Sequence, residues 1–252
     1  AHLATVAICG NPNSGKTTLF NALTGLNQKV ANYPGVTVER VSGSLKTDSS
    51  DTSRYLLVDI PGAYSLSAFS PDEYIAAQAL FGTISGEPVP DAIICVVDAT
   101  NLERGLYFLL QVVQIGRPVV VALNMTDLAH KRGLKIDAEV MSEEFGGIPV
   151  VPVVGSKQRG IKRLRAEAIK SAGESQSSGV NVIYDDTTEA VLVELAGIMK
   201  DDHHSKAELV RVLFDVDGPA EDGFRKRYGA EAHQRLLEGR QKIIEMHGGL
   251  TV

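Results

Sequence analysis

The chain has few cysteines, no long apolar run and no excess of basic residues, and each shortage excludes a class of protein. Its two cysteines, Cys9 and Cys95, lie inside apolar runs typical of buried strands, so neither a disulfide framework nor a cysteine metal site is indicated. The 252 residues contain no run of about 18 apolar residues, which excludes a membrane-spanning segment within them. A net charge of −6 argues against binding nucleic acid through a broad basic face.

The N-terminal region also lacks the basic segment and apolar stretch of a secretory signal, so we expect a cytosolic protein. The rest of the composition is that of an ordinary globular protein, with 44% hydrophobic and 22% charged residues. This length allows one large domain with a small appendage.

Over the first two thirds of the chain, apolar strand patterns alternate with amphipathic helix patterns. Continuous apolar runs at 92–97, 119–123 and 150–154 are typical of strands covered on both faces. Further strands are expected at 6–9, 36–45 and 55–59. Helices are expected after the first strand up to residue 23, from residue 70, at 106–113 and at 161–170. Residues 25–35 read as a polar stretch. This alternation predicts an α/β domain, with a mostly parallel sheet flanked by helices, over residues 1–172.

A change of composition marks the end of this domain. Residues 173–182 are small and polar and read as a linker. Residues 183–252 carry apolar residues at helical spacing without a strand pattern, which predicts a small all-α domain of three or four helices. Its stretch Asp201-Asp202-His203-His204 has metal-ligand chemistry, but consecutive residues of a helix do not face one point, so a polar loop between helices is favoured.

The strongest motif is Gly10-Asn11-Pro12-Asn13-Ser14-Gly15-Lys16-Thr17, which fits G-x-x-x-x-G-K-[ST]. Backbone N–H groups of such a loop wrap nucleotide phosphates. The lysine would neutralise the β- and γ-phosphates, and the threonine hydroxyl would hold Mg²⁺. A simple glycine turn with an exposed lysine is the alternative, and the setting between a strand and a helix disfavours it.

Three further motifs follow strands, where open α/β sheets bind ligands. In Asp59-Ile60-Pro61-Gly62, the aspartate would reach Mg²⁺ through water and the glycine N–H would meet the γ-phosphate. In Asn124-Met125-Thr126-Asp127, the last carboxylate can accept two hydrogen bonds from guanine that adenine cannot supply, although a capped helix start is an alternative. Gly155-Ser156-Lys157 would contact the base oxygen through backbone N–H.

In order and spacing these four motifs, together with Thr37, resemble the five motifs of translation-factor-type small GTPases. The stretch Asn32-Tyr33-Pro34-Gly35-Val36-Thr37-Val38-Glu39 and the pattern Asn124-Met125-x-Asp127 make the chain similar to the cytosolic N-terminal G domain of FeoB-type bacterial ferrous-iron transporters. The segment after the linker is similar to that family's GDI-like domain, which favours the GDP-bound state.

The resemblance implies that the chain binds GTP and GDP and hydrolyses GTP at the cytoplasmic face of the bacterial inner membrane. It further implies a membrane-embedded transporter portion in the same polypeptide, for which hydrolysis would regulate or drive ferrous-iron uptake. Self-association into a homo-oligomer is compatible with it, and no nucleic acid partner is expected.

Some residue roles rest on the resemblance alone. Thr37 would be the switch I threonine, which closes on Mg²⁺ and the γ-phosphate. Asn13 would coordinate K⁺ together with the backbone carbonyls of Ala31 and Tyr33, and this K⁺ would offset charge that develops between the β- and γ-phosphates. The implied catalytic residues are Asn13, Lys16, Thr37 and Gly62. The implied nucleotide contacts are Asn11, Pro12, Asn13, Ser14, Gly15, Lys16, Thr17, Thr18, Asn124, Met125, Asp127, Gly155, Ser156 and Lys157.

Two positions depart from the usual pattern. Ala63 stands where many GTPases have a water-orienting glutamine, so we expect slow intrinsic turnover. Met125 replaces a lysine that contacts the phosphate loop, so we expect weaker nucleotide binding and quick release. Two other functions stay open: a ribosome- or tRNA-associated GTPase, which the acidic balance disfavours, and a slow, non-catalytic GDP/GTP switch.

Overall fold

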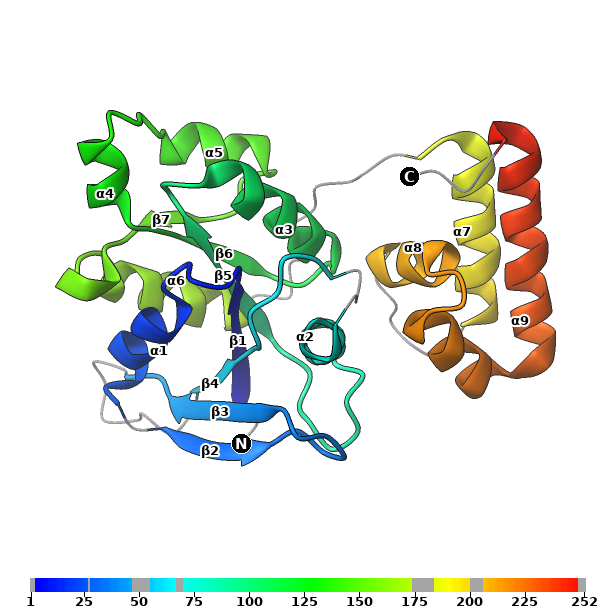
Figure 1. The fold of residues 1–252 in the computed structure, drawn as a ribbon, viewed down its shortest axis with the longest axis horizontal. Helices are drawn as coiled ribbons and strands as arrows, with labels where there is room; N and C mark the ends of the chain where they lie inside the picture. The colour runs from blue at the N-terminus through cyan, green and yellow to red at the C-terminus, as the bar shows by residue number, and fades with distance from the viewer. Residues whose placement is uncertain are drawn as a thin grey trace. The chain divides into compact units, whose positions relative to one another are not determined.

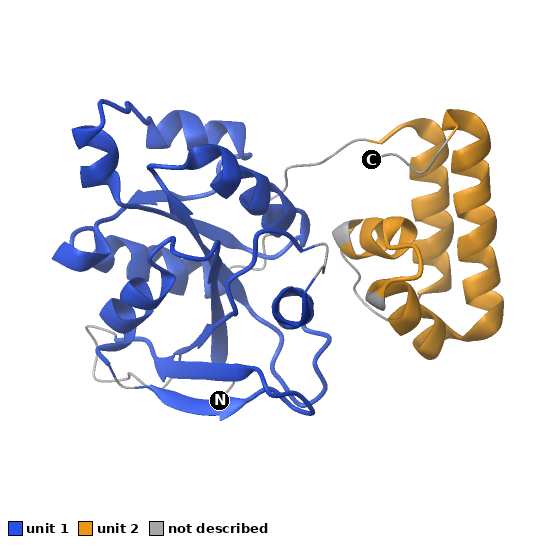
Figure 2. Cartoon of the chain, in the orientation of Figure 1, with its two compact units in different colours: residues 1–180 blue, residues 181–252 orange. Residues whose placement is uncertain are grey.

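The structure, a computed structural model, describes residues 3–26, 28–46, 55–66, 70–173, 184–199 and 206–248. The chain divides into two compact units, unit 1 at residues 1–180 and unit 2 at residues 181–252 (Figure 2). Among the helices described, none is long and apolar enough to cross a membrane.

Unit 1 is built on a seven-stranded sheet with the order β2-β3-β4-β1-β5-β6-β7 (Figure 1). The strands from β4 to β7 in this order run parallel, while β3 pairs antiparallel with both β4 and β2. The strands are β1 (Ala4–Gly10), β2 (Lys29–Asn32), β3 (Glu39–Ser44), β4 (Tyr55–Asp59), β5 (Ala92–Asp98), β6 (Val119–Asn124) and β7 (Val150–Pro152).

Helices cover both faces of this sheet, which confirms the predicted α/β fold. Successive residues of a strand point to opposite faces, so in β5 Ile93 and Cys95 pack beneath α2, α3 and α5, while Ile94 and Val96 pack beneath α1 and α6. The helical elements of unit 1 are α1 (Lys16–Thr24), α2 (Pro71–Phe81), α3 (Leu102–Gln114), α4 (Thr126–Lys131), α5 (Ala138–Glu144), the 3₁₀ turn η2 (Gly155–Lys157) and α6 (Ile161–Gly173).

The edge of the sheet differs from the sequence-based expectation. Strand β2 lies inside 25–35, which reads as a polar stretch, and all four of its residues are exposed. A strand that buries no face carries no alternation of apolar and polar residues, so periodicity cannot reveal it. The expected strand at 36–45 is shorter, because its first residues form the turn between β2 and β3.

Unit 2 is helical, with α7 (Asp186–Ile198), α8 (Lys206–Phe214) and α9 (Pro219–His247) packed around one apolar core. Gly229 interrupts α9 with φ 84° and ψ −177°, so α9 consists of two helices joined at a kink. Glycine has no Cβ and adopts this left-handed φ without strain. The Asp201–His204 stretch lies outside the described residues.

A buried ionic cluster joins the helices of unit 2. Glu221 accepts hydrogen bonds from Arg240 Nη1 at 2.6 Å and from the backbone N–H of Asp217 at 2.8 Å, and it lies 2.5 Å from His233 Nε2. Arg240 also donates to the carbonyls of Val212 and Leu213, at the C-terminal end of α8. Burial raises the pKa of Glu221, but the hydrogen bonds of His233 and Arg240 outweigh it and lower the pKa to about 2.

This cluster predicts acid sensitivity. A carboxyl whose folded pKa is below its unfolded value stabilises the fold above the unfolded pKa, near 4.5 here, and loses this contribution as the pH falls toward about 2. We therefore expect the difference in unfolding free energy between the unmodified chain and the Glu221→Gln variant to shrink from pH 6 to pH 3, measured by urea unfolding of the full chain. Parallel pH curves for the two proteins would contradict this.

Candidate nucleotide-binding site

Parallel pairing gathers the sequence motifs at one edge of the sheet. Gly10 pairs with Val96 at the end of β1, and Asp98 pairs with Asn124 at the ends of β5 and β6. Asp59 is the last residue of β4, which pairs in parallel with β1. The phosphate loop, Asp59 and Asn124 therefore lie along the carboxyl edge, where open α/β sheets bind ligands.

The phosphate loop, Gly10–Thr17, has the backbone that its pattern predicts. Asn13 and Gly15 adopt left-handed φ of 65° and 87°, a conformation that asparagine and glycine tolerate best. A Cβ on Gly15 would lie 2.2 Å from Asn124 Nδ2, so no larger residue fits there. Within the described residues, Asn11 Nδ2 and Ser14 Oγ are buried without a hydrogen-bond partner, which suits a loop that receives a polar ligand.

Lys16 of this loop forms an ion pair with Asp59 of β4, and both side chains are largely buried. Burial raises the pKa of Asp59, and the neighbouring Lys16 opposes this rise. The lysine expected to contact phosphate and the aspartate expected to face Mg²⁺ thus neutralise each other.

The chemistry of the donors fits a magnesium site. Thr17, the second residue of α1, is exposed, and its hydroxyl can rotate to offer an oxygen lone pair to a cation. Mg²⁺ usually keeps several waters and is bound by one or two protein oxygens together with substrate phosphates, so the Thr17 hydroxyl could bind it directly and Asp59 through water. The described part of the chain contains no cluster of three or more His, Cys, Asp or Glu residues suited to a metal.

Asn124 ties the two halves of the site together. Its Nδ2 donates to the carbonyl of Ser14 at 2.9 Å, and its Oδ1 accepts the N–H of Gly155 at 3.1 Å. The side chain is only 3% exposed. The sequence indicated Asn124 as a nucleotide contact but gave no sign of this bridge between the phosphate loop and η2.

The residues expected to recognise the base lie at the start of α4 and in η2. Asp127 Oδ2 pairs with Lys157 Nζ at 2.6 Å, and this hydrogen bond lowers the pKa of Asp127. Met125 has a left-handed φ of 62° directly before α4, and Thr126 Oγ1 donates to the carbonyl of Val153 at 3.2 Å. The carboxylate that would recognise guanine is therefore ionised and held by a lysine of the neighbouring loop, which also contains Ser156.

The residues expected to form switch I lie in the hairpin of β2 and β3. Thr37 is exposed on its turn, and the pairing of Val41 with Asp59 places this turn near the carboxyl end of β4. Ala31 pairs with Arg40 within the hairpin, and the carbonyl of Tyr33 accepts the N–H of Val36 at 3.2 Å. The two carbonyls expected to bind K⁺ and the threonine expected to bind Mg²⁺ therefore all lie in this hairpin.

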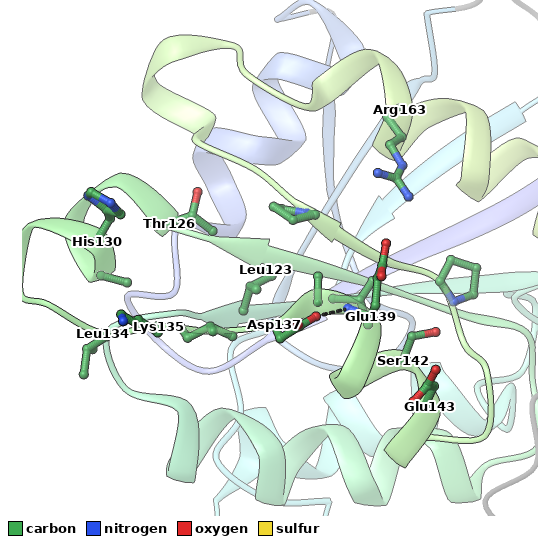
Figure 3. A pocket seen from close by; sticks show the side chains of 16 residues that line it. Leu123, Thr126, His130, Leu134, Lys135, Asp137, Glu139, Ser142, Glu143 and Arg163 are labelled. Carbon is green, nitrogen blue, oxygen red and sulfur yellow. Dashed lines mark hydrogen bonds between the residues drawn. The ribbon is translucent and has the colours of Figure 1, made fainter.

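A groove of about 1040 Å³ lies beside the nucleotide site rather than in it (Figure 3). Its walls come from α4, α5, the start of β7 and Arg163 of α6. Asp137 lines it and caps α5 by accepting the N–H of Glu139 at 2.9 Å. It shares Thr126 with the Asn124–Asp127 motif and contains no residue of the phosphate loop.

One side chain that contacts the segment after the Asp59–Gly62 motif was not indicated by the sequence. Gln111 of α3 hydrogen-bonds Ser65 and Leu66, directly after the Asp59–Gly62 motif. A glutamine at this point of an amphipathic helix matches no motif, so no signal in a single sequence could have found it.

Comparisons with known proteins agree with this geometry. The family model described as "Ferrous iron transport protein B" matches residues 4–168. The Fe(2+) transporter FeoB of Shigella flexneri is 41% identical over 239 residues, which are 92% of this chain and 29% of that protein. That of Salmonella typhimurium is 46% identical over 182 residues, which are 71% of this chain and 22% of that protein. The chain thus spans less than a third of the curated relatives it matches.

Solved structures agree as well. A GDP-bound mutant of S. thermophilus NFeoB superimposes with a TM-score of 0.79 and 34% identity, covering 98% of this chain and 92% of that one. The cytosolic domain of L. pneumophila FeoB gives a TM-score of 0.72 and 34% identity, covering 94% of this chain and 98% of that one. Fold and site together define a GTP-binding domain of the P-loop class. More specifically, the chain belongs to the ferrous iron transport protein B family.

The bridge formed by Asn124 generates a prediction. Asn124→Ala leaves a buried carbonyl and a buried N–H without their partner, and each such loss costs about 1–3 kcal/mol. We expect the free energy of unfolding to fall by about 2 kcal/mol or more and GDP affinity to fall with it, measured by urea unfolding and calorimetric titration. Asn101→Ala is the matched control, because Asn101 is exposed and makes no capping hydrogen bond. Equal stability of the two variants would contradict the bridge.

Proposed function

We propose that this chain hydrolyses GTP to GDP and phosphate, and that hydrolysis regulates or drives ferrous-iron uptake by a membrane-embedded portion of the same polypeptide. The observation that carries the proposal is the bridge of Asn124, because one side chain holds the phosphate loop and the base loop in a fixed relation. The match to FeoB proteins supports the link to iron, and the 29% coverage of a full-length relative leaves room for a membrane portion.

In this proposal each motif contributes one interaction to an in-line attack of water on the γ-phosphate. Lys16 leaves Asp59 and binds the β- and γ-phosphates, and the N–H of Gly62 binds the γ-phosphate. Thr17 and Thr37 would hold Mg²⁺, Asp59 would reach it through water, and Asn13 would hold K⁺ with the carbonyls of Ala31 and Tyr33. The two cations supply positive charge that offsets the negative charge of the transition state.

The domain arrangement belongs to the same proposal. We assign residues 1–172 to the GTPase domain, 173–182 to a linker and 183–252 to a GDI-like domain that favours bound GDP. The helical core of unit 2 supports a separate domain for the last segment. We place the chain at the cytoplasmic face of the bacterial inner membrane, as the cytosolic FeoB domains among its structural relatives suggest.

Guanine selectivity is the first test. Asp127→Ala removes the carboxylate that would accept two hydrogen bonds from guanine, so the preference for GTP over ATP should fall by about a hundredfold or more. Competition binding of the two nucleotides measures it. Asp222→Ala is the control, because Asp222 is an exposed aspartate of unit 2. If the Asp127 variant keeps the preference of the unmodified chain, the assignment of Asp127 to guanine is wrong.

Cation dependence is the second test. Asn13 is exposed on the phosphate loop, so Asn13→Ala should remove the stimulation of GTP turnover by K⁺ while GDP affinity stays within about twofold. Phosphate release in KCl and in NaCl measures this, with Asn101→Ala as the control. Equal turnover of the unmodified chain in the two salts would exclude a potassium site.

One observation favours the alternative of a slow GDP/GTP switch. Ala63 follows the Asp59–Gly62 motif, and its methyl group is fully buried in the apolar core, so it offers nothing to orient water. The same turnover measurement separates the two functions, because a switch without a catalytic role would show no appreciable stimulation by K⁺.

A further inference from the structure

The segment that follows β4 is fastened to α3 by a single glutamine. The backbone N–H of Leu66 donates to Gln111 Oε1 at 2.8 Å, and Ser65 Oγ lies 3.2 Å from both polar atoms of the same amide. Figure 1 shows this cyan segment leaving β4 for the region of α2 and α3. We call residues 59–66 the switch II segment.

The chemistry of the donors fixes the orientation of this amide. A backbone N–H can only donate, so the oxygen of Gln111 must face Leu66, and its Nε2 then faces the hydroxyl of Ser65. A hydroxyl both donates and accepts, so it satisfies either atom of the amide.

Other contacts hold the same stretch from the side. The guanidinium of Arg104 lies 5.0 Å from the ring centroid of Tyr64, and the N–H of Tyr64 donates to Glu73 Oε1 at 3.2 Å. The side chain of Leu66 is buried in the core beneath α2 and α3. The end of the switch II segment is therefore pinned by polar and apolar contacts together.

The beginning of the segment is fixed against the phosphate loop. The N–H of Ala63 donates to the carbonyl of Gly10 at 3.4 Å. A Cβ built on Gly62 would lie 3.3 Å from Pro12 Cγ, so the backbone of Gly62 runs directly beside the loop. Gly62, whose N–H is assigned to the γ-phosphate, thus lies on a short span with both ends held.

We propose that Gln111 is a positioning residue for GTP hydrolysis, which fixes the switch II segment so that the Gly62 N–H is in place before GTP binds. This inference rests on the proposed function, because it concerns the γ-phosphate. A donor that is already in place costs no reorganisation when charge develops on the γ-phosphate. Since the methyl group of Ala63 cannot orient water, the backbone of this span is what the segment offers to the reaction.

The proposal predicts different effects on GTP turnover and on GDP binding. GDP has no γ-phosphate, so loosening the segment should leave GDP binding intact while turnover falls. A merely structural role of Gln111 would instead lower thermal stability and GDP affinity together.

Three variants of the full chain test it. Gln111→Leu keeps the volume and removes both polar contacts. Gln111→Glu keeps acceptors for the Leu66 N–H and for the Ser65 hydroxyl, so it should restore function. Gln114→Leu changes a glutamine one turn further along the same helix, for which the structure gives no contact to the switch II segment, and is the matched control.

We expect Gln111→Leu to lower kcat for GTP about tenfold, with GDP affinity within about twofold of the unmodified chain and a similar Tm. Gln111→Glu should recover at least half of the lost turnover, and Gln114→Leu should behave as the unmodified chain.

Three results would overturn the inference. They are unchanged or increased kcat in Gln111→Leu, a parallel loss of GDP affinity and Tm, or equal defects in the Leu and Glu variants. If the unmodified chain binds GDP but releases no phosphate from GTP, the proposed function fails and this inference fails with it. If it turns over GTP and Gln111→Leu does so equally well, only the inference fails.

Discussion

The amide of Asn124 is the contact on which the nucleotide site depends. It is buried at the end of β6 and joins the carbonyl of Ser14 to the N–H of Gly155, so it crosses from the centre of the sheet to its last loop. Gly15 approaches this amide so closely that any side chain would collide with it. The same packing therefore selects a glycine in one loop and an asparagine at the end of a strand far along the chain.

The charges of the site are paired with each other. Lys16 is held by Asp59 and Lys157 by Asp127, so the groups assigned to phosphate, magnesium and guanine already have partners. A nucleotide that binds here exchanges one set of ion pairs for another, and the net gain is smaller than the new contacts alone would give. Because of this exchange and of the methionine at position 125, we expect modest affinity and quick release rather than tight binding.

The sequence predicted those parts of the fold that bury apolar side chains in a regular pattern. The runs at 92–97 and 119–123 lie between two layers of helices, and each appears as a strand in the structure. The phosphate loop was equally predictable from the sequence. Its glycines are required where the backbone turns and approaches its neighbours closely, and its lysine is required by the negative charge of a phosphate. The exposed strand β2 was missed, since it buries no face and so has no periodicity.

The contacts of Asn124 and Gln111 were unpredictable for a different reason. Both depend on which residues distant in the chain become neighbours, and an asparagine or glutamine in isolation matches many environments. Asn124 lay within a motif and was therefore named, although for a contact with the nucleotide. Gln111 lay within a helix pattern that predicted only its apolar neighbours, such as Leu109 and Val113.

The two switch segments differ in how firmly they are held, and this difference decides which one can move. The switch II segment buries Ala63 and Leu66 and is fastened at both ends. Strand β2 and the turn that follows it, residues 29–37, are exposed apart from Tyr33, whose ring is buried while its hydroxyl has no partner among the described residues. Burial raises the pKa of Tyr33, so the hydroxyl stays neutral in the core. Local opening is cheapest where few apolar contacts are lost. We therefore expect the turn after Tyr33 to be the part that rearranges when a nucleotide binds, against a switch II segment that is already in position.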